Sequence, residues 1–348
     1  MKTRIRCLPT GDLPYTDDKG ATRMMVKLFE EIPFLANLPK ASPDDSIVQR
    51  TLMNTPGVCI SEKKIVFNNE EAYLKQKLAA FDSAFNSPTP LILESYGFDC
   101  SFLSKYYQVI ERIKPAKTLI SLLGPMTISQ SMTNKEDVLL LTDKYYRKII
   151  IQAVSIKALW LIHKLKVISP ATQPLFILEE PLLYKAGVLK RENEEITHDL
   201  LVNMFAKIVS KIHEFGGLVG VQCFEKCDWN IPIDAGVDII SFGAYSNPNN
   251  LNIIPDKVNE FLAKGGKINW AIVPVSNEKI VKTTSVDYIS DRLMNTMEGL
   301  IIAGTSEKLV YNRATVSVQG NLTELPLFFA EKALITAHQV GKRIPVKS

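Results

Sequence analysis

Short, nearly continuous apolar runs recur along the chain, and most are followed by a longer segment whose apolar residues have helical spacing. The eight runs lie at residues 3–9, 90–97, 116–125, 174–181, 217–224, 236–245, 267–275 and 313–320. Apolar residues at successive positions are typical of a strand that is buried on both faces, as in a parallel sheet. The pattern therefore predicts eight parallel strands.

Helical patterns separate these runs. One lies at residues 17–32, another begins at Asn134 as its predicted cap, and a third ends at the Gly216–Gly217 pair. Strands that alternate with helices imply crossover connections, and eight such units in 348 residues favour a closed (β/α)8 barrel of the TIM type. A doubly wound nucleotide-binding fold is disfavoured because neither GxGxxG nor GxxxxGK[ST] occurs.

Residues 33–90 interrupt this alternation after the first helix. Within them, "PGVCISEKKIVFNNEE" is typical of a hairpin and "AYLKQKLAAFDSAF" predicts a helix. We expect this insertion to cover one end of the barrel. We expect the whole chain, residues 1–348, to form a single domain.

Composition and charge narrow the classes of partner. Lysine and arginine number 41 against 37 acids, a net charge of +4 without a basic block, so we expect no nucleic-acid partner. The most apolar helix pattern has an uncharged run far below the ~20 residues of a membrane span, so we expect no membrane partner. The first residues lack the apolar run of a signal peptide, and the five cysteines are scattered. We therefore expect a cytoplasmic protein with reduced thiols.

Reactive residues of barrel enzymes lie at the carboxyl ends of the strands and in the loops that follow. Glu179 and Glu180 close the fourth run, and we predict that they are catalytic. Two acids at the end of a buried strand are costly unless they meet a cation, a metal or a ligand amine. The alternative is that one points to solvent and the other caps the next helix. The other strand ends supply predicted substrate-binding residues: Gly11, Asp12, Tyr15, Glu94, Tyr96, Gly124, Thr127, Gln222, Phe224, Tyr245 and Gln319.

Histidine and cysteine provide no familiar motif. The four histidines fall in helical patterns, and no zinc-binding spacing or GxSxG elbow occurs. Cys223 and Cys227 are separated by three residues, whereas thioredoxin-type redox pairs have two. Strand alternation directs Cys223 away from Gln222 and Phe224, toward the helices, where a thiol packs as a small apolar group. A functional dithiol is the alternative.

Six short motifs, in order along the chain, resemble those of one superfamily. They are "GDLPYTD" at 11–17, "EEIPFLANLPK" at 30–40, "GPMT" at 124–127, "ILEEPLL" at 177–183, "HEFGGLVGVQCFEKCDW" at 213–229 and "GVDIISFGAY" at 236–245. The superfamily comprises cobalamin-independent methionine synthase (its C-terminal catalytic domain), uroporphyrinogen decarboxylase and the corrinoid-dependent methyltransferases. The resemblance spans nearly the whole chain and implies a short, single-barrel relative.

In the methyl-transferring members, the resemblance implies a zinc ion that activates a thiol. The positions of its four ligands fall on Gln222, Phe224, Gly243 and Gln319, none of which replaces a ligand of tetrahedral zinc. We therefore predict no metal and no resident cofactor. The remaining function is zinc-independent, methyltransferase-like chemistry on a small molecule, with a corrinoid on a partner protein as one methyl source.

Two alternatives stay open. The chain could be a non-catalytic, degenerate ligand-binding paralogue, which the four replaced ligands also favour. A decarboxylase of the uroporphyrinogen type ranks lower, because its substrate carries many carboxylates and no predicted strand end supplies an arginine.

Overall fold

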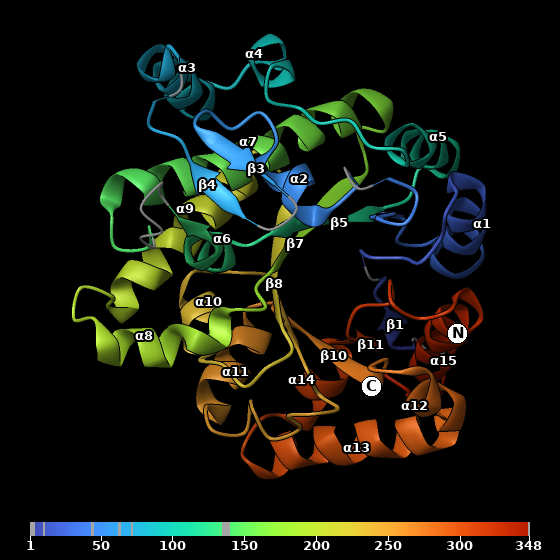
Figure 1. Ribbon diagram of the computed structural model, residues 1–348. Coiled ribbons are helices and arrows are strands. Elements are labelled where there is room, and N and C mark those ends of the chain that lie inside the picture. Colours follow the sequence, from blue (N-terminus) through green and yellow to red (C-terminus); the bar gives the residue numbers. More distant parts are fainter. Residues whose placement is uncertain are drawn as a thin grey trace.

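Eight parallel strands form one curled sheet in the computed structural model, which describes residues 4–9, 11–42, 45–61, 64–70, 72–133 and 140–346 (Figure 1). In spatial order the strands are β1 (Arg6–Cys7), β11 (Ala314–Gln319), β10 (Lys267–Pro274), β9 (Ile239–Phe242), β8 (Leu218–Cys223), β7 (Gln173–Glu179), β5 (Lys117–Leu123) and β2 (Phe34–Leu35). Every neighbouring pair is parallel. The predicted α/β barrel architecture is confirmed.

The two ends of this sheet meet just beyond β1 and β2. The backbone N–H of Asn37 donates to the Gly11 carbonyl at 2.6 Å, and the N–H of Leu13 donates to the Asn37 carbonyl at 3.0 Å. These bonds form a parallel bridge between Asp12 and Asn37. The bridge closes the sheet into a barrel.

The prediction of a strand at residues 90–97 is wrong, because this segment contains the helix α4 (Pro90–Glu94). The Thr89 hydroxyl accepts from the Ile92 N–H, and Pro90 occupies the first turn, where its fixed φ favours a helix. Its apolar residues are not buried on both faces, since Leu93 is buried and Leu91 is 83% exposed. The barrel strand at this position is β2, which lies inside the range predicted as an insertion.

The rest of the 33–90 segment contains the predicted hairpin and helix. Strands β3 (Val58–Ile60) and β4 (Ile65–Phe67) are antiparallel, and β4 also pairs with β6 (Met132–Thr133). The helices are α2 (Ile47–Leu52) and α3 (Leu74–Asn86). The Asp82 carboxylate on α3 accepts from the Gln152 amide on α7 at 2.6 Å. The segment therefore packs along α7 (Lys144–Ile168).

Helices surround the sheet as the crossover connections require (Figure 1). Beside those already given, they are α1 (Asp18–Phe29), α5 (Leu103–Ile113), α6 (Pro125–Ser131), η1 (Leu183–Lys185), α8 (Ala186–Glu192), α9 (His198–Glu214), α10 (Asn230–Asp234), α11 (Pro255–Ala263), α12 (Glu278–Thr283), α13 (Val286–Ile302), α14 (Glu307–Asn312) and α15 (Leu327–Arg343). The predicted cap Asn134 lies outside the described residues, and the observed cap of α7 is Asp143. In the described part of the chain, no helix has the length and hydropathy of a membrane span.

Helix α7 is buried around most of its circumference because the sheet and the 33–90 segment cover it from two sides. Its Lys157 is 1% exposed, and its ammonium donates to the backbone carbonyls of Met53, Tyr96 and Gly97. Burial lowers the pKa of Lys157 to about 7. One side chain thus ties three loop carbonyls to the helix.

A second buried cation, Arg50 on α2, holds the carboxyl end of β2. Its guanidinium donates to the carbonyls of Leu35 at 2.9 Å and Ala36 at 2.8 Å, and the residue is 2% exposed. Because β2 has only two residues in its ladder, these bonds supply much of its anchorage.

We predict that Arg50→Met lowers the free energy of unfolding by about 2–4 kcal/mol, because two buried carbonyls lose their donors. Urea unfolding measures the change. Arg6→Met is the matched control, since Arg6 forms an exposed ion pair with Glu31 and its loss should change stability by less than about 1 kcal/mol. Equal losses in both variants would contradict the anchoring role of Arg50.

Candidate functional site

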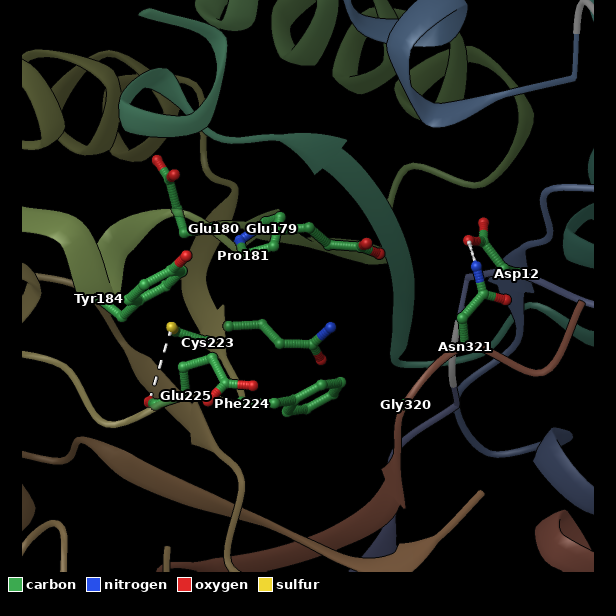
Figure 2. A pocket seen from close by; sticks show the side chains of 11 residues that line it. Asp12, Glu179, Glu180, Pro181, Tyr184, Cys223, Phe224, Glu225, Gly320 and Asn321 are labelled. Carbon is green, nitrogen blue, oxygen red and sulfur yellow. Dashed lines mark hydrogen bonds between the residues drawn. The ribbon is translucent and has the colours of Figure 1, made fainter. Parts of the chain in front are cut away.

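A cavity of about 590 Å³ opens at the carboxyl ends of the barrel strands (Figure 2). Its walls come from the loop after β1, the end of β7 with η1, the end of β8 and the loop after β11. The lining residues are Asp12, Glu179, Glu180, Pro181, Tyr184, Gln222, Cys223, Phe224, Glu225, Gly320 and Asn321. This is the end of the barrel at which the sequence predicts the site.

Asp12 and Glu179 approach each other from opposite walls of this cavity. Figure 2 shows the Glu179 side chain extended toward Asp12. The Asp12 carboxylate accepts from the Asn37 amide at 2.6 Å and from the Asn321 amide at 3.1 Å. These two amides fix the position of Asp12 while one face of its carboxylate stays directed at the cavity.

The two carboxyl groups affect each other's protonation. Burial first, and then the nearby Asp12 charge, raises the pKa of Glu179 to about 8, against the lowering effects of Ser121 and Arg50. Burial also raises the pKa of Asp12, whereas Asn37, Arg50 and Asn321 lower it. Two carboxylates in one low-dielectric cavity cannot both ionise readily. The pair therefore shares one proton near neutral pH.

Glu180 has a different environment from Glu179, although the two are adjacent. It is 0% exposed, and its carboxylate accepts from the N–H of Met126 at 2.8 Å and from the N–H and hydroxyl of Thr127, both at 2.7 Å. Burial raises the pKa of Glu180 to about 7, and these donors oppose the rise. Figure 2 shows Glu180 directed away from Glu179. Glu180 therefore caps the amino-terminal turn of α6. It also lines the cavity, and its catalytic role stays a prediction.

Gly124 makes this cap possible. It precedes α6, and a Cβ atom at this position would lie 2.2 Å from the Glu180 Oε1 atom. Its N–H donates to the Glu179 carbonyl at 2.9 Å. Gly124 and Thr127, both predicted to bind substrate, thus support the two acids from behind.

Three predicted substrate-binding residues lie away from the cavity. The Tyr15 hydroxyl donates to Glu331 on α15, and Tyr15 lines a separate surface hollow between α1 and α15. Glu94 on α4 forms an ion pair with Lys164 and accepts from the Trp160 indole. Tyr96 packs edge-on against Phe81. Glu94 and Tyr96 are displaced because their segment is the helix α4 and the turn that follows it.

The remaining predicted residues form the cavity wall or its support. Gln222 and Phe224 line the cavity, and Gly11 lies behind it, where a Cβ atom would be 3.0 Å from the Ser121 hydroxyl. The Gln319 amide oxygen accepts from the backbone N–H groups of Tyr245 and Ser246 at 3.0 and 3.2 Å. Gln319 and Tyr245 therefore brace a loop beside the cavity.

The four positions at which the motif resemblance implies zinc ligands lie at or beside this wall. A Cβ atom on Gly243 would lie 2.2 Å from the Phe224 carbonyl oxygen and 3.1 Å from the Gln319 side-chain carbon. Gln222 lies two residues before Phe224 and lines the same cavity. In the described ranges, no three His, Cys, Asp or Glu side chains lie close enough together to hold a metal ion. The Phe224 backbone and the Gln319 side chain thus lie against Gly243, and the Gln222 amide oxygen accepts from the Ser241 hydroxyl at 3.4 Å.

Several residues of the site are not among those predicted from the sequence. Asn37 and Asn321 orient Asp12, and Arg50 lowers the pKa of both acids from behind the wall. Asn37 lies in "EEIPFLANLPK", one of the six quoted motifs, and Asn321 comes two residues after Gln319. Both positions are close enough to predicted features for the sequence to have indicated them. Arg50 had none, because a helix brings it to the strand end from outside the predicted strands.

No family model and no curated protein matches the sequence. Among solved structures, the chain is similar to a B12-independent methionine synthase from Shewanella sp. W3-18-1 in complex with selenomethionine, with 12% identity, 71% of this chain and 67% of that chain covered, and a TM-score of 0.46. It is also similar to a β-N-acetylhexosaminidase, with 13% identity, 73% and 56% coverage and a TM-score of 0.39. A third is the apo form of a putative deoxyribose-phosphate aldolase from Toxoplasma gondii ME49, with 10% identity, 82% and 96% coverage and a TM-score of 0.34.

We predict that Gly124→Ala destabilises the protein by about 1–3 kcal/mol, because the new methyl group displaces the buried Glu180 carboxylate. Thermal and urea unfolding measure the loss. Gly187→Ala in α8 is the matched control, since the nearest atom would be 3.8 Å away and alanine favours a helix. In a Glu180→Ala background the Gly124→Ala loss should shrink, and strict additivity of the two changes would contradict the contact.

The raised pKa of Glu179 makes folding depend on pH. Between its unfolded value of 4.5 and its folded value of about 8, the folded state binds the proton and the unfolded state does not. This stability is fully present below pH 4.5 and is lost as pH rises through about 8. We predict that Glu179→Gln removes part of this decline. The free energy of unfolding of the variant, relative to that of the natural chain, should rise by about a few kcal/mol as pH increases across that window.

Urea unfolding at a series of pH values tests this prediction. Glu94→Gln is the control. The hydrogen bond from Lys164, above all other causes, lowers the pKa of Glu94, so the contribution of Glu94 to stability is constant at pH values above its unfolded pKa of 4.5. A Glu179→Gln curve parallel to that of the natural chain would show that Glu179 titrates normally in the fold.

Proposed function

We propose that the cavity at the strand ends binds a small molecule that carries an amine or another cationic group, and that Glu179 is its general acid–base. The observation that carries the proposal is the charge of the cavity. Asp12, Glu179 and Glu225 line it, and among the described lining residues there is no lysine, arginine or histidine. A cationic ligand would compensate carboxylates that have no cation of their own in the cavity.

The chemistry follows from the shared proton. Near neutral pH the pair carries about one negative charge, because the two buried carboxyl groups share one proton. An ammonium group in the cavity favours the fully ionised pair, so Glu179 can release its proton when the ligand binds and take a proton from the ligand later. A carboxyl group with a pKa near the working pH is suited to transfer in both directions.

The finer proposal is methyltransferase-like chemistry without zinc. Its support is the series of six motifs that resemble the methyl-transferring superfamily, together with the replacement of the four ligand positions. An amine nitrogen becomes nucleophilic when Glu179 removes its proton, and no thiol then requires activation by a metal. In this proposal a corrinoid on a partner protein is the methyl carrier.

A second candidate is a binding protein without catalysis. The specific observation in its favour is that Gly243, Phe224 and Gln319 are packed together at the wall and that Gln319 is occupied with backbone N–H groups. A decarboxylase of the uroporphyrinogen type is disfavoured, because a polycarboxylate substrate would face the carboxylates of Asp12, Glu179 and Glu225.

Thermal unfolding in the presence of small ligands tests the proposed charge preference. We predict that methylated amines or amino acids raise the melting temperature, whereas simple di- and tricarboxylates do not. A ligand at one hundred times its Kd adds about 2.7 kcal/mol of stability. Asp12→Asn and Glu179→Gln should abolish the effect, and Glu94→Gln, which lies on α4 away from the cavity, should leave it intact.

The outcome also separates the two candidate functions. Methylation of a stabilising amine by a methylated corrinoid, or transfer of a methyl group from such an amine to an unmethylated corrinoid, would support the enzyme. Stabilisation without turnover would support the binding protein. Stabilisation by carboxylates alone, or an amine effect that survives Glu179→Gln, would overturn the proposed site.

A further inference from the structure

The two cysteines after β8 lie together. Cys223 is the last residue of β8 and is 1% exposed, and Cys227, in the loop before α10, is 7% exposed. Each of the two thiols affects the pKa of the other, so the two are near neighbours. The Cys223 thiol also lies 3.7 Å from the Glu225 carbonyl oxygen, as the dashed line in Figure 2 shows. The sequence favours independent packing roles for the two cysteines, and the structure instead places both thiols, buried, at the two ends of one short loop.

Cys223 also lines the cavity, although strand alternation predicts that it faces the helices. Its strand ends at this residue, and the chain turns there into the loop of Phe224, Glu225 and Lys226. A small molecule in the cavity can therefore reach the wall that contains this thiol, even though bulk water barely contacts it.

The two thiols differ in acidity. The neighbouring Cys227 thiol lowers the pKa of Cys223, with smaller lowering effects from the backbone of Glu225 and Tyr184. Burial first, and then Cys223, raises the pKa of Cys227. Cys223 is thus the better thiolate, and Cys227 keeps its proton.

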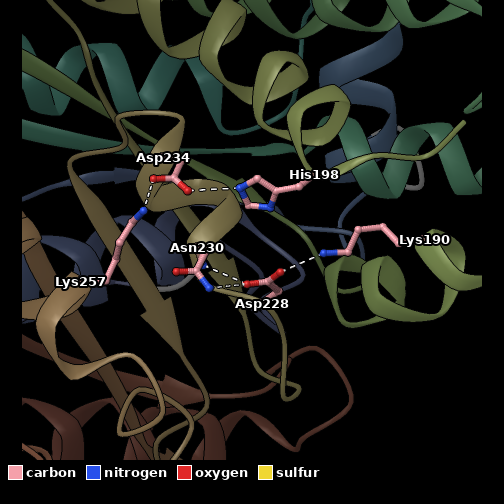
Figure 3. Close-up of polar contacts among 6 residues, drawn as sticks. All are labelled: Lys190, His198, Asp228, Asn230, Asp234 and Lys257. Carbon is pink, nitrogen blue, oxygen red and sulfur yellow. Dashed lines mark hydrogen bonds and ion pairs between the residues drawn. The ribbon is translucent and has the colours of Figure 1, made fainter. Parts of the chain in front are cut away.

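The far end of the loop is held in place (Figure 3). Asp228, next to Cys227, forms an ion pair with Lys190 on α8 at 3.0 Å and accepts from the side-chain amide of Asn230 at 2.9 Å. Asp234 on α10 contacts both His198 and Lys257. Cys223 is held by the strand and Cys227 by this network, whereas Glu225 and Lys226 between them are exposed. The short loop can therefore adjust when the sulfur atoms approach bonding distance.

We propose that Cys223 and Cys227 form a peroxide-reactive dithiol that closes to a disulfide at the cavity wall. The Cys223 thiolate attacks one oxygen of a hydroperoxide, the O–O bond breaks, and the products are a Cys223 sulfenic acid and, after protonation, water or an alcohol. The Cys227 sulfur then attacks the sulfenic sulfur. The S–S bond forms, the S–O bond breaks, and the Cys227 proton leaves with the oxygen as water. The peroxide is reduced by two electrons and the two thiols are oxidised.

The disulfide would act on the cavity directly. Phe224 and Glu225 lie within the five-residue ring that it closes, and both line the cavity. The oxidised and reduced proteins should therefore differ in the shape and charge of one cavity wall. This inference does not rest on the proposed function, because it needs only the two thiols and access through the cavity.

The other three cysteines provide an internal comparison. Cys7 is buried, and burial raises its pKa to about 12, whereas Cys59 is exposed. Burial, above all other causes, raises the pKa of Cys100 to about 11. The pKa shifts of Cys7 and Cys100 do not involve another thiol. A non-specific oxidant would react first with the exposed Cys59.

Peptide mapping of the natural chain tests the proposal. The reduced protein is treated with equimolar hydrogen peroxide, the remaining thiols are alkylated, and the protein is digested with trypsin. Cleavage after Lys226 separates the two cysteines, so the disulfide appears as a cross-linked pair of peptides that reduction separates. We predict that Cys223 and Cys227 lose their alkylation together while Cys7, Cys59 and Cys100 keep theirs. Preferential oxidation of Cys59, or oxidation of Cys223 to a sulfinic acid without a disulfide, would overturn the proposal.

Variants separate the two roles. In Cys227→Ser, the Cys223 sulfenic acid should persist and be trapped by a cyclic 1,3-diketone, whereas in Cys223→Ser, Cys227 should stay reduced. Cys59→Ser is the matched control and should form the disulfide as the natural chain does. Trapping at Cys227 in the Cys223→Ser protein would reverse the assigned roles and overturn this mechanism. If a Cys→Ser variant at one of these buried positions fails to fold, peptide mapping of the natural chain still decides whether the disulfide forms.

Discussion

The architecture depends on one short parallel bridge between the segments that follow the first and second barrel strands. Only two residues each of β1 and β2 belong to the ladder, so the two backbone bonds between Asn37 and residues Gly11 and Leu13 complete the closed sheet. Because residues 11 and 13 use their backbone in this bridge, the side chain of Asp12 meets the amide of Asn37 at the mouth of the barrel. Closure of the fold and placement of an acid in the cavity are therefore the same event.

Burial of charge distinguishes the two adjacent acids at the end of β7. Alternation along a strand sends neighbouring side chains in opposite directions, so Glu179 enters the cavity and Glu180 enters the first turn of α6. Glu180 finds three donors, as a buried carboxylate requires. Glu179 finds another acid, and Arg50 behind the wall lowers its pKa only in part. The same chemical group thus meets hydrogen-bond donors at one position and a second acid at the next.

The sequence predicts the barrel because long, buried strands have a strong apolar pattern. The pattern fails at β2, which has only two residues, and at "PLILE", where Thr89 and Pro90 start a helix that an apolar count alone cannot distinguish from a strand. Asp12, Glu179, Gln222 and Phe224 were predictable because they follow strands and line the cavity. The positions of Arg50 and Cys227 depend on how a helix and a loop pack in three dimensions, which no local spacing encodes.

The contact between Gly124 and Glu180 links two positions that are far apart in the chain. Any side chain at residue 124 would occupy the space of the Glu180 carboxylate, and any loss of that carboxylate would leave three donors of α6 unpaired. Neither residue can drift alone through single substitutions, so the two must be inherited as a unit. In an alignment of descendants of this chain, the two positions would therefore change together.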